Sequence, residues 1–435
     1  MWVWVMQTRS SGEKRFEAGA RTALLIRRSD LPVPLEHPAL SYLGGLPKLP
    51  PDFDWPRAKV TRAGKEETVA LTFLAQVYLS ELPRFEGRSA LPEQGTLFFF
   101  CYSAFDEVIP PPCRVLYHRE NAAALPQRDP PSDLMPLGGK DNGYYGKWLS
   151  MGGGLHANVE FKYPVSFLTF KDQLFNEDRV RGKLLVKSLC EALGPGEPES
   201  TRQLMDVNAL AKDVDWPFSW SLLADAARSV VSHVEFDLRP NPRRQMSEAT
   251  RDVLRDLLTT ATEWRERAAA HSPFAIPDLA VRESFRSWWM GAVSRYKGFK
   301  RGEVSTYDTR FARDLENAIL HSIKLLAAEN GSALARAPSK YVDNFRRRNV
   351  WTVPRAEEGQ FRQFRMAIHQ MLGFGKSVQQ APIEHRDHVL LLQLQGDDAF
   401  FPWHNNCGCV LQLWIGKDAL TRRDFSVVEA TLECD

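Results

Sequence analysis

The sequence is poor in cysteine, with six in 435 residues, and it has no long apolar run. Its longest apolar stretches, 97–101 and 389–392, fall far short of the roughly 20 residues of a membrane-spanning helix. Sparse cysteines exclude a small secreted domain held by disulfides, so we expect all six to be reduced thiols. The apolar start, residues 1–6, lacks the basic region and cleavage site of a signal peptide. These absences predict a cytoplasmic protein that does not associate with membranes.

An excess of charge of one sign is also missing. The 56 Lys and Arg residues nearly balance the 54 Asp and Glu residues, which leaves a formal net charge of +2. Such a chain has no long-range field that would attract nucleic acid, so we expect no dedicated nucleic-acid binding. Hydrophobic residues make up 43% and charged residues 25%, which is typical of a folded globular protein and excludes a disordered or fibrous chain.

The apolar pattern divides the chain into three segments. Residues 1–180 and 356–435 contain short apolar runs separated by proline and glycine, as antiparallel strands do. Residues 181–355 instead have apolar residues at three- and four-residue spacing, which is typical of amphipathic helices. We predict an α+β fold in which 1–180 and 356–435 pack together as one antiparallel β framework, and 181–355 is a helical insertion.

Individual helices are clearest at 247–271 and 309–330, where apolar residues return on one face. Gly331 stands where a glycine commonly ends a helix, so we expect the second helix to end there. A shorter helix is expected at 357–371. The tryptophans of the helical segment are interpreted as core residues rather than as the lining of a ligand pocket.

One short pattern occurs in both β segments. A strand with a central glutamine, Gln76 in one case and Gln393 in the other, is followed by a loop, a glycine and a second strand. An amide buried without partners costs about 1–3 kcal/mol, so we expect both glutamines to bond to backbone or to the other half. The pattern indicates a pseudo-duplication, and chance similarity between short segments is the alternative.

Several motifs in order also give a family resemblance. The amino segment contains SYLGGLPKLP at 41–50, Trp55 before a proline, and GTLFF at 95–99; the carboxyl segment contains HQMLGF at 369–374 and a late Gly408. In order and spacing these motifs resemble the YwqG-like bacterial proteins, over about 1–118 and 365–435.

The resemblance to the YwqG-like family implies an α+β fold and no known catalytic residue, because the family has no known function. Its members often lie near genes for secreted toxins, which implies an immunity or antitoxin role. This chain departs from the family pattern at one turn. Where the family usually has Trp-Gly-Asp ahead of the late glycine, Trp403 is followed here by His404, Asn405 and Asn406. Loss of the acidic residue puts a charge-based role of this turn in doubt.

Histidines and cysteines near the carboxyl end suggest an alternative function. Ligand types suited to zinc gather there, namely His385, His388, His404, Cys407 and Cys409. Their spacing matches no common zinc motif, and the two cysteines could equally be small core residues. The alternative is therefore an enzyme or small-ligand protein that uses a cleft between the two β halves, with a metal at His404, Cys407 and Cys409.

The sequence contains no common catalytic motif. We therefore expect a non-enzymatic protein-binding module without a cofactor, of the immunity type, which binds and neutralises a bacterial toxin encoded nearby. The expected binding surfaces are the 403–409 turn, a glycine-rich loop at 138–154 and the helical segment. The candidate binding residues are Trp55, Gln76, Gln393, Trp403, His404, Asn405, Asn406, Tyr144 and Tyr145.

Overall fold

A computed structural model gives the fold of the chain. It describes residues 19–62, 64–103, 108–135, 137, 158–174, 188–189, 191–193, 197–198, 213–240, 246–298, 304–349, 352–353, 368–396, 400 and 409–434. The chain forms two compact units. Unit 1 comprises Met1–Leu149, Gly153–Ser200 and Asn349–Asp435, and unit 2 comprises Ser150–Gly152 and Thr201–Arg348. The interpretation of 181–355 as an insertion stays a prediction.

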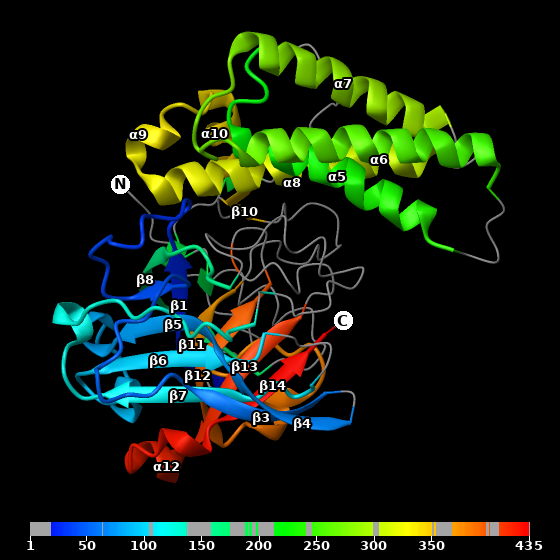
Figure 1. The fold of residues 1–435 in the computed structure, drawn as a ribbon. Helices are drawn as coiled ribbons and strands as arrows, with labels where there is room; N and C mark the ends of the chain where they lie inside the picture. The colour runs from blue at the N-terminus through cyan, green and yellow to red at the C-terminus, as the bar shows by residue number, and fades with distance from the viewer. Residues whose placement is uncertain are drawn as a thin grey trace, which may run out of the picture. The chain divides into compact units, whose positions relative to one another are not determined.

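Unit 1 contains a ten-stranded antiparallel sheet (Figure 1). In spatial order the strands are β14 (Glu429–Glu433), β13 (Val410–Gly416), β12 (His388–Gln395), β11 (Gln370–Leu372), β1 (Arg21–Arg28), β8 (Tyr163–Asp172), β2 (Tyr42–Leu43), β5 (Thr72–Tyr78), β6 (Thr96–Cys101) and β7 (Cys113–His118). Strands from both ends of the chain meet at the centre, where β1 pairs with β11 on one side and with β8 on the other. The predicted α+β fold, with an antiparallel framework from both chain ends, is confirmed.

The strands on either side of the centre are apolar on both faces. In β6 every residue is buried, in β5 and β13 all but the last residue are, and in β12 the central residues are. Such continuous apolar runs form strands that are covered on both faces. One core cluster lies between Tyr42 of β2 and the aromatic side chains of β5 and β6, where the rings of Phe73 and Phe100 meet edge to face at 5.3 Å.

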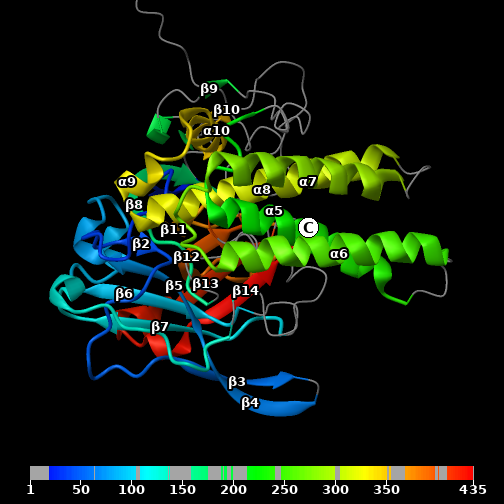
Figure 2. The same ribbon diagram turned by 45° about the horizontal axis from the view of Figure 1, so that its top comes forward.

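A hairpin of β3 (Arg57–Arg62) and β4 (Lys65–Ala70) adds a separate two-stranded sheet to unit 1 (Figure 2). A parallel pair, β9 (Glu197–Pro198) and β10 (Thr352–Val353), forms another. Two short helices, α11 (Ala381–Glu384) and α12 (Lys417–Thr421), complete the described part of the carboxyl segment.

The two halves of the large sheet repeat one arrangement. Outward from the centre, β1, β11, β12, β13 and β14 correspond in order to β8, β2, β5, β6 and β7. Both β5 and β12 have a shift in strand register at the equivalent place, between Phe73 and Ala75 and between Leu390 and Leu392. In each strand the shift ends at the residue before the central glutamine. A shared irregularity at one position favours duplication over chance similarity.

The central glutamines make equivalent hydrogen bonds. In each half, the glutamine Oε1 accepts from one backbone N–H, and the Nε2 donates to a carbonyl oxygen eight residues earlier in the chain than that N–H. In one half, Gln76 accepts from Lys48 N at 3.0 Å and donates to the Leu40 carbonyl oxygen at 2.9 Å. In the other half, Gln393 accepts from Lys376 N at 2.7 Å and donates to the Ile368 carbonyl oxygen at 2.8 Å. The expectation that both amides bond to backbone is confirmed.

The outer strand β7 contacts the segment that precedes β14. The ring of Tyr117 in β7 lies 5.5 Å from the ring of Phe425, and the guanidinium group of Arg423 lies 5.9 Å from the Tyr117 ring. One outer strand of the sheet therefore contacts the segment that leads into the other outer strand.

Unit 2 is helical in its described residues. Its helices are α5 (Trp220–Leu238), α6 (Glu248–Ala269), α7 (Leu279–Gly298), α8 (Val304–Glu329), α9 (Gly331–Leu334) and α10 (Ser339–Asn349). Serine residues begin two of them, because the side chain of Ser219 accepts from Leu222 N in α5 and that of Ser247 accepts from Thr250 N in α6. None of the helices within the described residues combines the length and apolar content needed to cross a bilayer.

The helix expected at 309–330 is present as α8, and it ends at Glu329, one residue before the expected end. Gly331 does not cap this helix but begins α9, because the side chain of Asn330 accepts from Ala333 N at 2.8 Å and starts a new turn. The helix expected at 357–371 fails at its carboxyl end, where Gln370–Leu372 form β11. Residues 370–372 form a strand because they pair with β1 and β12, and this pairing outweighs the local helical periodicity. Residues 357–367 lie outside the described residues.

Candidate functional site

Of the residues expected to bind a partner, Gln76 and Gln393 are fully inside unit 1. Their exposed fractions are 1% and 0%, and their amides hold the turns described above. Trp55 is partly buried in the same unit. Its Nε1 donates to the Leu71 carbonyl oxygen at 2.8 Å, and its ring packs against Phe100 at 5.4 Å. These contacts show that the three side chains stabilise the fold of unit 1.

The other expected binding residues lie outside the described residues. They are Tyr144, Tyr145, Trp403, His404, Asn405 and Asn406. Cys407, which was expected as a metal ligand together with His404, also lies outside them. Their role in binding stays a prediction.

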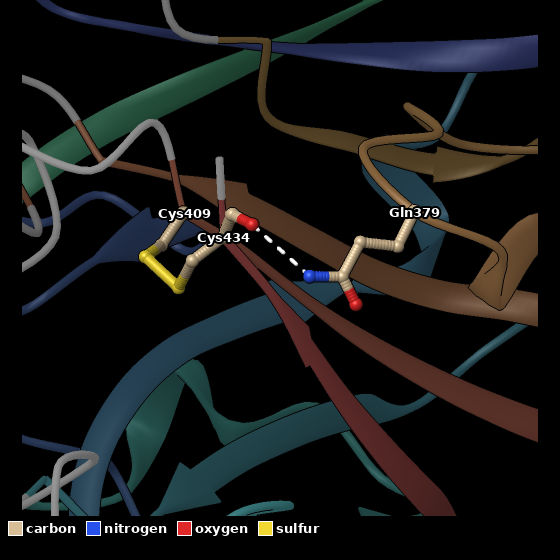
Figure 3. The surroundings of a disulfide bond; sticks show 3 residues. All are labelled: Gln379, Cys409 and Cys434. Atoms are coloured by element: carbon tan, nitrogen blue, oxygen red, sulfur yellow. Dashed lines mark hydrogen bonds between the residues drawn. A yellow bond between two sulfur atoms is a disulfide. The ribbon is translucent and has the colours of Figure 1, made fainter.

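Cys409 is joined to Cys434 by a disulfide (Figure 3). The expectation that all six cysteines are reduced thiols is therefore wrong for these two. Their separation of 25 residues concealed the pairing, whereas β13 and β14 bring the Cα atoms to 4.1 Å. The thiolate is the form of cysteine that binds metal, so a disulfide-bonded Cys409 cannot serve as the expected ligand. Next to it, Gln379 donates from Nε2 to the Cys434 carbonyl oxygen at 3.1 Å.

His385 and His388 are neighbours, with ring centroids 5.2 Å apart. His385 donates from Nδ1 to the Ala381 carbonyl oxygen at 2.9 Å, and its Nε2 lies 3.3 Å from a carboxylate oxygen of Glu429. Its ring also stacks on Trp414 at 5.2 Å. Within the described residues, no group of three or more His, Cys, Asp or Glu side chains could hold a metal ion.

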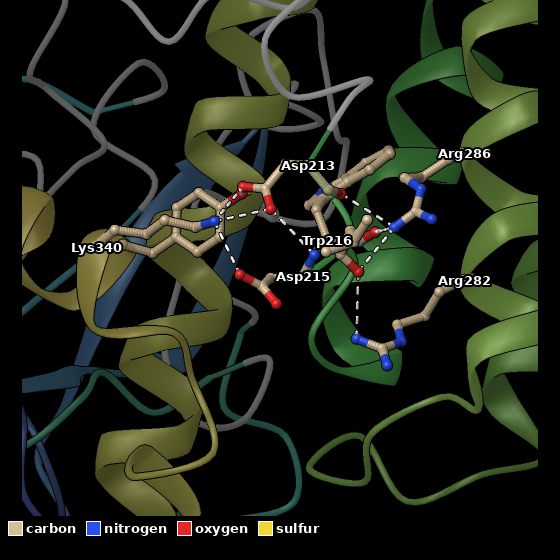
Figure 4. Close-up of polar contacts among 8 residues, drawn as sticks. Asp213, Asp215, Trp216, Arg282, Arg286 and Lys340 are labelled. Carbon is tan, nitrogen blue, oxygen red and sulfur yellow. Dashed lines mark hydrogen bonds and ion pairs between the residues drawn. The ribbon is translucent and has the colours of Figure 1, made fainter.

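The strongest candidate surface is a loop of unit 2, formed by Asp213, Val214, Asp215, Trp216 and Pro217 (Figure 4). We refer to it as the 213–217 loop. The loop belongs to the helical segment, which is among the expected binding surfaces, but the sequence pattern does not single it out. Polar side chains from α7 and α10 hold its backbone and its carboxylates, as the following contacts show.

Arg286 of α7 holds the backbone of the 213–217 loop from one side. Its Nη1 donates to the carbonyl oxygens of Asp213, Val214 and Trp216, at 3.0, 2.9 and 2.8 Å. Arg282, one helical turn earlier, donates to the Val214 carbonyl oxygen at 3.4 Å. Both arginines lie on the same face of α7 because residues four apart are neighbours on a helix. The largely buried guanidinium group of Arg286 therefore constrains the loop backbone at three carbonyl groups.

Lys340 and Tyr341 of α10 hold the loop from another side. Lys340 Nζ lies 2.8 Å from an oxygen of Asp213 and 2.9 Å from an oxygen of Asp215. The hydroxyl group of Tyr341 donates to the other oxygen of Asp213. Asp213 also accepts from the backbone N–H of Asp215 at 3.0 Å, which closes the turn locally. Both carboxylates thus connect the loop to α10, and that of Asp213 does so through Lys340 and Tyr341.

These contacts determine the ionisation of Asp213. Burial alone would raise the pKa of this carboxyl, but hydrogen bonds from Lys340, Tyr341 and the Asp215 backbone outweigh burial and lower the pKa below its ordinary value. The pKa of Lys340 is raised, because its bonds to the two carboxylates outweigh the effect of burial. Asp213 is therefore a carboxylate and Lys340 an ammonium group at neutral pH.

The 213–217 loop combines a buried anchor with an exposed tip. Trp216 has no exposed surface and packs against Phe285 and Trp289, with ring centroids 5.7 and 5.6 Å away. Val214, two residues earlier, is 63% exposed. Leu279, on the α7 face that carries Arg282 and Arg286, is 53% exposed.

This arrangement suits recognition better than catalysis. A loop held in one conformation loses little conformational entropy when it binds, so more of its contact energy contributes to affinity. Val214 offers an exposed apolar contact, and the half-exposed carboxylate of Asp215 lies beside it in the chain.

Part of the signal for the loop is present in the sequence. Two aspartates before a Trp-Pro pair are typical of a turn, and arginines at positions 282 and 286 share a helix face. Nothing in the sequence says that α7 and the turn meet, because they are about 70 residues apart and meet through tertiary packing.

Comparison with known protein families shows which family the chain resembles. A family model described as a domain of unknown function (DUF1963) matches residues 41–219 and 233–434. The matched ranges include the 213–217 loop, α7 and α10 as well as most of the large sheet. No curated protein matches the chain.

Proposed function

Because the chain belongs to the DUF1963 family, whose description assigns no function, we propose from its geometry that it is a non-enzymatic protein-binding module. The observation that carries the proposal is the 213–217 loop, which exposes Val214 on a backbone held by Arg286. In this proposal the partner covers Val214 together with Leu279 and contacts the half-exposed carboxylate of Asp215.

We further propose that the partner is a bacterial toxin encoded near the gene for this chain, and that binding in the cytoplasm neutralises it. This part of the proposal rests on the resemblance to the YwqG-like family, whose members often lie near toxin genes. A rigid loop fits such a role because an immunity protein must remain bound to its toxin, and a preorganised surface slows dissociation.

Variants of the exposed apolar residues test the proposed surface. Val214→Asp and Leu279→Asp each place a charge where the partner would bury an apolar group, so each should weaken binding tenfold or more, about 1.4 kcal/mol. Val427→Asp is a matched control, since Val427 is 49% exposed but belongs to unit 1. The measurement is affinity capture with each immobilised full-length chain, followed by quantitative mass spectrometry.

The proposal predicts at least one protein that the wild-type chain and Val427→Asp capture and that both loop variants lose. An identical set of captured proteins for all four chains would contradict it. The toxin hypothesis is tested separately by expressing the product of each adjacent gene with and without the chain. Growth should recover with the wild-type chain and not with Val214→Asp, whereas no growth defect or no recovery would count against the toxin.

A further inference from the structure

Two free cysteines face each other across the outer pair of strands in unit 1. Cys101 ends β6 and Cys113 begins β7, and the strand register pairs them directly. Side chains of directly opposed residues in an antiparallel pair lie on the same face of the sheet. The two thiol groups are therefore neighbours, although 11 residues lie between them in sequence.

Cys101 and Cys113 form the kind of antiparallel pair in which the two Cα atoms are closest to each other. Tyr102 donates its backbone N–H to the Pro112 carbonyl oxygen at 2.9 Å, so the adjacent pair, Cys101 and Cys113, is a non-hydrogen-bonded pair. Such pairs have Cα atoms about 4.5 Å apart, which lies within the range that disulfides span. The same chain already joins two adjacent strands in this way, with the Cα atoms of Cys409 and Cys434 at 4.1 Å.

We propose that Cys101 and Cys113 are a redox-active pair that forms a second cross-strand disulfide when the protein meets a low-molecular-weight disulfide such as oxidised glutathione. In this reaction both S–H bonds break and one S–S bond forms. The two protons and two electrons pass to the small disulfide, whose S–S bond breaks to give two thiols. The oxidised pair links β7, which is an outermost strand of the described sheet, covalently to β6.

Burial controls the rate of this reaction. Cys101 has no exposed surface and Cys113 has 4%, so the oxidant cannot reach either sulfur in the closed sheet. Burial also raises the pKa of the Cys113 thiol to about 12 and that of Cys101 well above its ordinary value, which leaves little of the reactive thiolate. Among the described strands β7 pairs with β6 alone, so opening of this edge gives access. Oxidation is therefore slow and follows local opening.

Mass spectrometry of the oxidised protein tests the proposal. The folded full-length chain is incubated with oxidised glutathione, its remaining thiols are blocked with N-ethylmaleimide during denaturation, and it is digested without reduction. We expect a peptide that links Cys101 to Cys113, absent before oxidation and lost after dithiothreitol. Recovery of both residues as maleimide or glutathione adducts, or linked to other cysteines, would overturn the proposal.

Two variants control the measurement. Replacing the known disulfide in a Cys409→Ser, Cys434→Ser double variant should leave the new cross-link unchanged, which separates it from disulfide exchange. In Cys113→Ser the linked peptide should be lost, and Cys101 should be recovered as a maleimide adduct or as the mixed disulfide. If Cys113→Ser does not fold, the wild-type digest alone decides the question.

Discussion

Single residues set the geometry of unit 1 through buried polar bonds and through glycine. Gln76 and Gln393 each connect a strand to the turn that follows the neighbouring strand. Both bonding patterns could be predicted from the sequence because a glutamine in an apolar strand requires backbone partners. The identity of those partners could not, since they come from segments 17 to 36 residues away along the chain.

Removing one buried amide should destabilise the fold. Gln393→Met keeps the side-chain volume but leaves the Lys376 N–H and the Ile368 carbonyl group without the amide partner. We expect a loss of about 1–3 kcal/mol in the free energy of unfolding, measured by urea denaturation. Gln94→Met is the matched control at an exposed position, and its effect should stay within about 0.5 kcal/mol. Equal effects of the two substitutions would contradict this role for Gln393.

Replacing Gly44 by alanine should destabilise the protein, whereas replacing Gly291 by alanine should stabilise it. Gly44 has a φ of +64°, and an added Cβ would lie 2.1 Å from the carbonyl oxygen of Phe161. Gly44→Ala should therefore cost more than the roughly 1–2 kcal/mol of the left-handed conformation alone. Gly291, inside α7, has open space around it, so Gly291→Ala should stabilise the protein by about 0.5–1 kcal/mol. Thermal unfolding of both variants checks the opposite signs.

At the scale of elements, the long regular ones could be predicted and the short ones could not. Strands β6 and β12 and helix α6 have apolar runs or periodicity strong enough to define them locally. The β3–β4 hairpin has alternating charged residues and few apolar ones, so it gave no strand signal. β11 has three residues, and its state depends on β1 and β12 rather than on its own sequence.

The contact between the 213–217 loop and α10 predicts a pH dependence. The pKa of Asp213 in the folded protein lies below its ordinary value of 3.8, so the unfolded chain takes up the proton first as the pH falls. The stabilisation is complete above that ordinary value and is lost as the pH falls through the folded pKa. The urea midpoint of unit 2 should therefore decrease below about pH 4.

Comparison with Asp213→Asn isolates this effect. The variant keeps the shape of the side chain but cannot ionise, so its urea midpoint should be lower than that of the wild type at neutral pH, with the difference shrinking in acid. A difference that is constant over the same pH range would show that the carboxylate of Asp213 contributes through packing rather than charge.

At the scale of the whole molecule, the joining of distant segments was the part of the fold that motifs could predict. Matching motifs at both ends pointed to one β framework, and β1 does pair with β11. The disulfide between Cys409 and Cys434 was missed because cysteine spacing alone does not show which strands are adjacent. The candidate loop was missed for the same reason, since it depends on contacts of the loop with α7 and with α10.

Reduction should affect the two units differently. The Cys409–Cys434 disulfide joins residues 25 apart in the sequence. According to the chain-entropy relation, its reduction should lower the free energy of unfolding of unit 1 by about 3 kcal/mol. Unit 2 has no residue between these two cysteines and should keep its stability. Hydrogen exchange with and without dithiothreitol checks this, with faster exchange expected in β13 and β14 and unchanged exchange in α5 and α6. Faster exchange in all four elements would show that the units unfold together.

The central position of β1 also has a consequence for biosynthesis. During translation β1 emerges early, but one of its edges has no neighbour until residues 370–372 have left the ribosome. For most of that time, the backbone N–H and C=O groups along this edge of β1 are unpaired and can pair with another chain. The strand also carries four aliphatic residues that are buried only in the folded protein. Nascent chains halted before β11 should therefore need a chaperone on that edge, whereas chains that have added β11 and β12 should not.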